Sequence, residues 1–262
     1  MFQPIVPGDG LVGWRFLQRT YDVQFEAFNA STVLQRDTTY FSEKIAQVTS
    51  AEDLVKDRRL MTVALGAFGL QDDINNRYFI QKVLEEGTAS NDTLAMRLSD
   101  TRYREMSDAF GFGPSATPRL GDALFAEEII SRFQSNTFEV AAGEQNDAMR
   151  IALYAQRELP ELAAREASTD TKWFTILSEP PLRKLFERAL NLPTSIGQID
   201  IDQQLDIFKD RAVSVFGTDD LTLFKDPELV QEAITKFVVR DQISNLSLGQ
   251  SSSSIALTLL SG

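Results

Sequence analysis

One short signature occurs four times in this chain: two apolar residues, a spacer, an acidic residue and then an apolar stripe with helical spacing. The acidic residues are Asp57, Asp100, Glu179 and Asp226, and the second copy departs from the signature at its first position, Arg97. Behind each acid, apolar residues return every three or four positions, as they do on the buried face of a helix. An internal repeat indicates architecture before chemistry, so we expect a duplicated helical unit.

The distances between the four acids indicate a second level of order. Asp57 and Glu179 are 122 residues apart and Asp100 and Asp226 are 126 residues apart, so the copies follow an A-B-A-B order. Alternation of apolar and polar residues, which marks a half-buried strand, is scarce in the sequence. The sequence therefore predicts an all-α, multihelical fold with an internal tandem duplication of a two-unit helical block.

Capping residues predict where individual helices begin and end in the first half. Ser50 is the expected N-cap of a short helix that ends at Lys56, and Asp57 is the expected N-cap of a helix that Gly69 ends. Further helices are predicted over 75–86, from 91 or 92 to 99, and from Asp100 to a stop at Gly111 and Gly113.

Two of the four acids directly precede proline, in Glu179-Pro180 and Asp226-Pro227. Proline fits the first helical position because the amide at that position has no partner within the helix. We therefore interpret all four signature acids as helix caps. The resulting division has an N-terminal aromatic arm or helix over 1–32, a first helical block over 33–116, connecting helices and a second block over 117–248, and a serine-linked apolar tail over 249–262.

Both ends of the chain are candidates for binding a partner. From Leu11 the sequence predicts an amphipathic helix with an aromatic stripe, and the tail ends in an apolar hexamer after four serines. The stripe either packs on the core or docks on a partner, because aromatic residues are favoured in both settings. The partner-binding candidates are Trp14, Phe16, Tyr21, Phe25, Phe28, Leu257, Leu259 and Leu260.

Histidine and cysteine are both absent from the chain. This excludes disulfides, thiolate chemistry and every Ser-His or Cys-His dyad, and it removes the commonest general base and metal ligand. An enzyme would have to use carboxylates, Lys, Tyr or a Ser-Lys pair. No catalytic, cofactor-binding or metal-ligating residue is predicted, and no cofactor is expected.

Three patterns imitate known sites without the context that those sites need. Gly8 to Gly13 matches G-x-G-x-x-G, but no buried strand precedes it, as a dinucleotide-binding fingerprint requires. Asp200 and Asp202 lack the glycine and the final glutamate of a calcium loop, so they are better explained as charges at a helix start. Adjacent acids such as Glu127 and Glu128 face apart on a helix, unlike a catalytic acid/base pair.

The chain has 38 acidic against 26 basic residues, a net charge of -12. This charge disfavours nucleic acid, whose binding depends on phosphate neutralisation by Lys and Arg, and it disfavours anionic membrane surfaces. The longest apolar stretch, Val63 to Leu70, is too short to cross a membrane, and the first ten residues do not resemble a cleavable signal. A protein without membrane insertion and without a cleavable signal peptide is the resulting expectation.

Several strings along the chain together resemble one family. They are Gly13-Trp14-Arg15-Phe16-Leu17-Gln18-Arg19-Thr20, Tyr40-Phe41, Ala51-Glu52-Asp53-Leu54-Val55-x-Asp57-Arg58, Ala64-Leu65-Gly66-Ala67-Phe68-Gly69-Leu70, Phe138-Glu139-Val140, Gly143-Glu144-Gln145, Met149-Arg150-x-Ala152-Leu153, Pro181-Leu182-Arg183 and Ala189-Leu190-Asn191-Leu192-Pro193, where x is any residue. They resemble the alphaproteobacterial domain of unknown function family 1217. The resemblance implies a helical fold and a gene neighbourhood rich in flagellar basal-body and hook genes, and it implies no catalytic residue.

Three functions are compatible with these observations. The first is a non-enzymatic, flagellum-associated structural or interaction protein that binds protein partners through its ends. The second is a cytoplasmic flagellar export chaperone or assembly factor that holds apolar helices in a groove. The third is a carboxylate-based glycan hydrolase, which would need two acids that face a common cleft.

Overall fold

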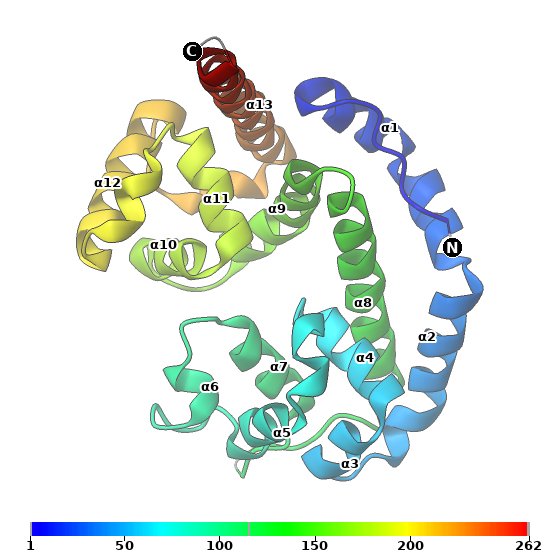
Figure 1. Cartoon of the computed structure of the whole chain (residues 1–262). Helices are drawn as coiled ribbons and strands as arrows, with labels where there is room; N and C mark the ends of the chain where they lie inside the picture. Colours follow the sequence, from blue (N-terminus) through cyan, green and yellow to red (C-terminus); the bar gives the residue numbers. More distant parts are fainter. Residues whose placement is uncertain (1, 115, 261–262) are drawn as a thin grey trace. The chain divides into compact units, whose positions relative to one another are not determined.

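The computed structural model describes residues 2–114 and 116–260, and the side chains of residues 123 and 247–260 lie outside this description. Within the described residues the chain forms thirteen α-helices and four 3-10 helices and no strand (Figure 1). The prediction of an all-α, multihelical fold is therefore confirmed. No helix in these ranges is both long enough and apolar enough to cross a membrane.

The chain divides into two compact units. The first unit contains residues 1–4 and 21–141, and the second contains residues 5–20 and 142–262. The divisions fall within two helices, α1 (Gly10–Asn29) and α8 (Ala123–Gly143). Most of α8 belongs to the first unit, and the predicted boundary between 116 and 117 stays a prediction.

The first unit holds six further α-helices and two 3-10 helices. These are α2 (Thr32–Lys44), η1 (Ile45–Gln47), α3 (Ala51–Lys56), α4 (Arg58–Ala67), η2 (Gln71–Asn75), α5 (Arg77–Glu86), α6 (Leu94–Arg97) and α7 (Arg102–Phe110). Helix α8 joins them through long-range contacts: the Asn136 amide donates to the backbone oxygen of Ala67 over 2.7 Å, and both groups are buried. A contact across 69 residues of chain has no local signature, so sequence periodicity could not assign α8 to this unit.

The second unit is built around α9 (Asp147–Ala164), α11 (Pro180–Ala189) and α13 (Pro227–Leu260), which pack on one another. Its other elements are α10 (Thr169–Ser178), η3 (Thr194–Gln198), α12 (Ile201–Phe216) and η4 (Leu221–Lys225). Trp173 of α10 is buried against the rings of Phe186 and Phe208, and its indole nitrogen donates to the backbone oxygen of Asp219. These aromatic contacts form the centre of the α10–α12 layer.

Local sequence signals determine most of the helix ends. Ser50 caps α3 by accepting from the Asp53 amide, and Asp57 caps α4 by accepting from two amides. Gly69 and Asn191 both adopt left-handed backbone angles, with φ of +68° and +56°, after α4 and α11. The residue after each bonds back to the last helical turn, which is the hydrogen-bond pattern of a Schellman motif. Asparagine can replace glycine at this position because it tolerates the left-handed conformation.

Two of the predicted helices and one predicted cap need correction. Helix α5 begins at Arg77 and not at Asn75, because the preceding residues form the 3-10 turn η2. Helix α6 covers only Leu94–Arg97, less than predicted, since a turn occupies residues 91–92 and the backbone of Leu98 is extended. Glu179 precedes α11, but its side chain makes no capping hydrogen bond.

The order of the elements is similar in the two units, apart from η1, which has no counterpart in the second unit. Helices α2, α3 and α4, the turn η2 and then α5, α6 and α7 correspond in order to α9, α10, α11, η3, α12, η4 and α13, with the short α6 matched by the 3-10 turn η4. The predicted tandem duplication agrees with this order, and it stays a prediction.

Gly66 of α4 allows the closest approach between α4 and α8. A Cβ atom at this position would lie 2.6 Å and 2.8 Å from two ring carbons of Phe133. Because Phe133 is buried, we expect Gly66→Ala to lower the free energy of unfolding by about 1–3 kcal/mol, as overpacking does. Chemical denaturation of this variant and of Gly121→Ala, where a Cβ would meet open space, measures the difference. Equal stability of the two variants would contradict the prediction.

Candidate functional site

The signature acids are structural groups in both units, and two of them accept a tyrosine hydroxyl. The Tyr40 hydroxyl donates to Asp57 Oδ2 over 2.6 Å, and the Tyr154 hydroxyl donates to Glu179 Oε2 over 3.0 Å. Glu179 is buried, so the hydrogen bond stabilises a carboxylate that is largely withdrawn from water. The interpretation of all four acids as caps is therefore wrong for Glu179, which contacts α9 instead.

The other two acids bond to the backbone near a helix start. Asp226 Oδ1 accepts from the Glu228 amide over 2.9 Å, as the cap prediction requires. Asp100 Oδ1 accepts from the Arg102 amide over 3.1 Å, and the Asp100 carboxylate also pairs with the Arg102 guanidinium at 2.6 Å. Asp100 therefore fixes the entry into α7 from one residue before its N-cap, Thr101.

Asp57 joins α2 and α4 through a compact network. Burial raises the pKa of its carboxyl group, but the Tyr40 hydroxyl and the amides of Leu60 and Arg59 outweigh this and hold the pKa below its usual value. The same carboxylate raises the pKa of Tyr40. The Arg59 guanidinium lies 4.0 Å from the centre of the Tyr40 ring, in cation–π geometry.

We expect Asp57→Asn to reduce the pH dependence of the free energy of unfolding. The pKa of Asp57 is lower in the folded state than in the unfolded state, where it is about 3.9. The ionised carboxylate therefore stabilises the fold at pH values above about 3.9. This contribution is lost as the pH falls through the folded-state pKa. Because asparagine still caps a helix, we expect a loss of about 1 kcal/mol at pH 7 and a smaller difference below about pH 4.

Urea denaturation at pH 7 and at about pH 3.5 measures this effect, with the exposed Asp92→Asn as the matched control. A difference between wild type and Asp57→Asn that stays constant over this pH range would contradict the role given to the carboxylate.

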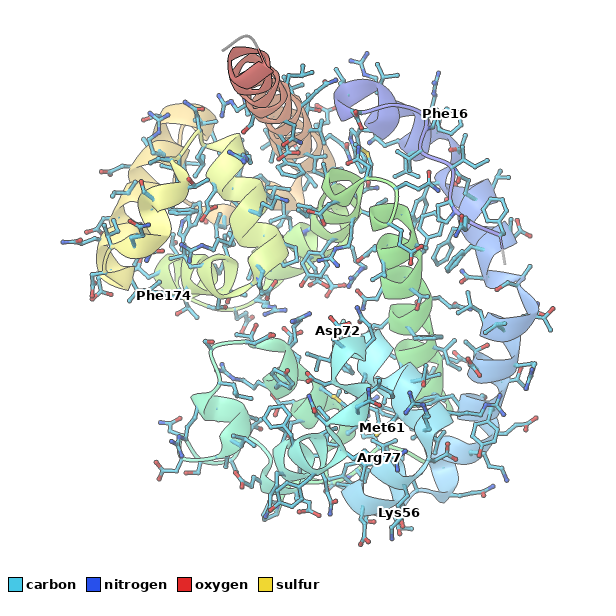
Figure 2. All side chains as sticks on the ribbon, viewed as in Figure 1. Phe16, Lys56, Met61, Asp72, Arg77 and Phe174 are labelled. Atoms are coloured by element: carbon cyan, nitrogen blue, oxygen red, sulfur yellow. The ribbon has the colours of Figure 1, made fainter. Side chains whose placement is uncertain are left out.

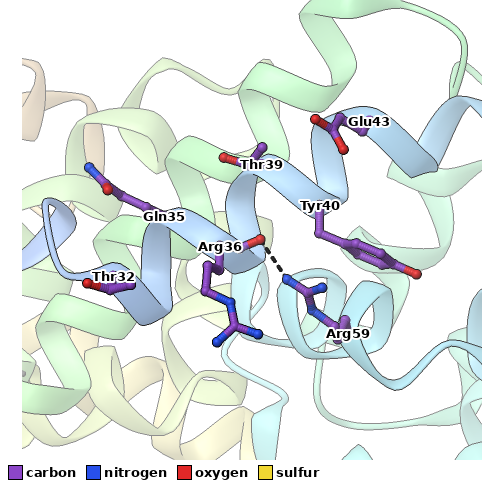
Figure 3. Close-up of a pocket in the computed structure, with 7 residues that line it drawn as sticks. All are labelled: Thr32, Gln35, Arg36, Thr39, Tyr40, Glu43 and Arg59. Carbon is purple, nitrogen blue, oxygen red and sulfur yellow. Dashed lines mark hydrogen bonds between the residues drawn. The ribbon is translucent and has the colours of Figure 1, made fainter.

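A polar groove of about 350 Å³ lies beside this network, along the exposed face of α2 (Figure 3). Its lining residues are Thr32, Gln35, Arg36, Thr39, Tyr40, Glu43 and Arg59. Arg59 Nη2 donates to the backbone oxygen of Arg36 over 2.7 Å, drawn as a dashed line in Figure 3, and its Nε lies 3.3 Å from Asp37 Oδ1. Contacts within its own unit thus hold Arg59 at the wall of this polar groove.

A second groove, of about 250 Å³, has mostly apolar walls and lies between α2, α4 and α8. Leu34, Phe133 and Val140 form part of the walls, and the exposed Val33 lies at the edge. Asp37 and Asn136 supply polar groups in the same groove. An apolar groove with a few polar groups can accept the apolar face of a helix.

The aromatic candidates of the N-terminal helix differ in exposure. Trp14 and Phe28 are buried inside their own units, so they serve packing. Tyr21 and Phe25 are half-buried and contact the ring of Phe138. Phe16, labelled on α1 in Figure 2, is half-buried as well.

The C-terminal candidates Leu257, Leu259 and Leu260 lie in the last turns of α13, and their side chains are outside the described residues. On the described part of α13, Ile243 and Leu246 are 57% and 61% exposed. These two side chains, like Val33, were not singled out from the sequence. The exposure of a single apolar residue cannot be predicted from the sequence until the solvent-facing side of its helix is known.

The part of the chain that the structure describes contains no cluster of three or more acidic, histidine or cysteine side chains that could hold a metal ion. The site features are therefore a polar groove, an apolar groove and the exposed face of α13.

Comparison with known proteins agrees with the fold. A crystal structure of a protein from Agrobacterium tumefaciens matches the chain with a TM-score of 0.74 and 26% sequence identity, over 93% of this chain and 99% of that protein. No curated protein matches the sequence significantly. The profile of the family described as "Protein of unknown function (DUF1217)" matches residues 67–230, which is more than half of the chain. This chain therefore belongs to the DUF1217 family.

Proposed function

We propose that this chain is a non-enzymatic, flagellum-associated structural or interaction protein. The observation that carries the interaction role is the exposed apolar face of α13 at Ile243 and Leu246, which lies directly before the uncharged tail. Contiguous exposed apolar surface is typical of sites that bind another protein, and Ile243 and Leu246, three residues apart, are neighbours on the surface of α13. The flagellar association rests on the gene neighbourhood that the family resemblance implies.

The amino-acid composition supports a non-enzymatic role. A protein without histidine and cysteine lacks the side chains that most enzymes use near neutral pH. The tyrosines with raised pKa values, Tyr40, Tyr103 and Tyr154, each donate to a carboxylate inside their own unit. Such tyrosines stabilise the fold and are not poised as acids or bases.

Purified hook–basal bodies from the source bacterium test this function. We expect mass spectrometry to find the protein in them at a fixed ratio to a known basal-body component, and we expect a deletion strain to lose motility. A deletion strain with normal flagella and motility would overturn the proposal, as would a protein that is absent from every flagellar fraction.

The apolar groove between α2, α4 and α8 favours a second candidate, a cytoplasmic flagellar export chaperone or assembly factor. A chaperone of this kind would hold the apolar face of a client helix in the groove. Val33→Glu places a charge at the edge of this groove, and it should abolish client binding if the groove is used. The two candidates differ in location, since a cytoplasmic chaperone would be absent from purified hook–basal bodies.

A further inference from the structure

The polar groove of the first unit is lined mainly by one exposed face of α2. The α2 residues of this face recur every three or four positions, so they lie side by side along the helix, and all of them are exposed: Thr32, Gln35, Arg36, Thr39 and Glu43. Tyr40 and Arg59 complete the lining (Figure 3). The volume of about 350 Å³ falls within the range of about 300–1,000 Å³ that is typical of ligand sites. The groove is therefore large enough for a ligand, and it lies open along one helix face.

The exposed side chains of this α2 face have hydrogen-bonding capacity that the chain itself does not use. Within the described residues, none of these five side chains makes a hydrogen bond or an ion pair with another part of the chain. Arg36 and the threonine and glutamine side chains can donate, and Glu43 can accept. The groove thus offers a ligand both kinds of partner along a single helix face.

Arg59 supplies a donor group that is already fixed in place. Its guanidinium lies 4.0 Å from the centre of the Tyr40 ring, Nη2 donates to the Arg36 backbone oxygen over 2.7 Å, and Nε lies 3.3 Å from Asp37 Oδ1. Its remaining nitrogen, Nη1, has no hydrogen-bond partner among the described residues. A fixed donor loses little conformational entropy when it binds a ligand. Arg36 adds a second guanidinium to the same part of the groove, and no acidic side chain of the described chain pairs with it.

The charges around the groove determine which ligand fits. Guanidinium groups match the planar geometry of a carboxylate, which accepts two hydrogen bonds side by side. Asp37 accepts from the Arg59 guanidinium and Asp57 from the Arg59 amide. These two carboxylates, together with Glu43, repel the double charge of a phosphate more than the single charge of a carboxylate. A single carboxylate is therefore the anion that the two arginines accommodate best.

Glu43 determines the chemistry of the other end of the groove. It lies seven residues after Arg36, which is about 10 Å along the helix. A second carboxylate would be repelled at this end, whereas a lysine or arginine side chain would be attracted. In an extended chain with about 3.3 Å per residue, this distance corresponds to about three positions.

We propose that this groove binds an extended segment of a partner protein in which an acidic and a basic residue lie about three positions apart. The carboxylate of the segment accepts hydrogen bonds from Arg36 and from Arg59 Nη1, and its cationic side chain pairs with Glu43. The inference goes beyond the proposed function, because it concerns a different surface from α13 and does not depend on a flagellar location. Since the contacts are charged and exposed, binding weakens as the ionic strength rises.

An NMR titration of the isotope-labelled full chain tests this inference. The probe is a hexapeptide with capped ends in which one glutamate and one lysine are three positions apart. We expect saturable shifts of the α2 amides from Thr32 to Glu43 and of the Arg59 Nε–H signal. A peptide with glutamine in place of the glutamate should bind about tenfold more weakly or worse, because it loses the charge-assisted hydrogen bonds. Inorganic phosphate should bind more weakly than the first peptide.

Variants of exposed residues assign the two ends of the peptide. Arg36→Gln should weaken binding about tenfold or more, and Arg36→Lys, which keeps the charge but not the planar group, should have an intermediate effect. Arg77→Gln on α5 removes an exposed positive charge outside the groove, so it is the matched control and should leave binding unchanged (Figure 2). Glu43→Gln should weaken binding of the peptide with lysine and not of a peptide with alanine at that position.

The absence of saturable shifts on α2 at peptide concentrations up to about 10 mM, well above a millimolar dissociation constant, overturns the inference. Equal binding of the glutamate and glutamine peptides also overturns it, as does equal weakening by Arg36→Gln and Arg77→Gln. Phosphate that binds as tightly as the peptide would make the groove a site for small anions and not for a protein segment. The detection of the protein in hook–basal bodies is a separate measurement, so failure of the peptide to bind leaves the proposed function standing.

Discussion

Phe138→Ala is expected to lower the free energy of unfolding of the first unit by about 3–5 kcal/mol, which is the usual cost of truncating a buried phenylalanine. The Phe138 side chain is 0% exposed. Its ring meets those of Tyr21, Phe25 and Phe28 edge to face, with centroids 5.3–5.5 Å away. Each such pair adds about 0.5–1.5 kcal/mol beyond the buried area, so the alanine variant loses three ring contacts as well as its own burial.

Hydrogen exchange of peptides from residues 21–141 measures this loss locally, and urea denaturation followed by circular dichroism measures it globally. Phe174→Ala on α10 is the matched control, because Phe174 is 36% exposed and should cost less than about 1 kcal/mol (Figure 2). If Phe138→Ala were as mild as this control, the aromatic stripe of α1 would not be part of the core. That result would favour the alternative interpretation, in which the aromatic stripe docks on a partner.

The helix ends of this protein could be predicted well where the signal is carried by neighbouring residues. Asp57 and Gly69 delimit α4 because a cap needs only an oxygen near two amides, and a Schellman ending needs only a residue that accepts positive φ. Gly111 ends α7 for the same reason. Glu179 broke this pattern since the hydroxyl of Tyr154, 25 residues earlier, competes for its carboxylate.

The division into units and the grooves could not be predicted in this way. The Phe133 ring lies where a Cβ atom at Gly66 would be, yet 67 positions separate the two residues in the sequence. The apolar groove is lined by three helices that only the folded unit brings together. The N-terminal helix illustrates the same difficulty, because its periodicity predicted an aromatic stripe but could not tell the buried Phe28 from the half-buried Tyr21 and Phe25.

The second unit depends on Trp173 as the first depends on Phe138. Trp173 is 0% exposed, its ring lies 5.3 Å from that of Phe186 and 6.2 Å from that of Phe208, and its Nε1 donates to the Asp219 backbone oxygen over 2.8 Å. One side chain thus links α10, α11, α12 and the turn before η4. We expect Trp173→Ala to lower the free energy of unfolding by about 3–5 kcal/mol.

Trp173→Phe separates the two contributions, since it keeps most of the ring contacts and leaves the Asp219 oxygen without the indole donor. We expect it to cost about 1–3 kcal/mol, clearly less than the alanine variant. Trp14 is the only other tryptophan and belongs to the same unit, so its fluorescence reports unfolding in both variants. If Trp173→Phe were as destabilising as Trp173→Ala, the hydrogen bond to Asp219, and not the aromatic packing, would hold α10 against α11 and α12.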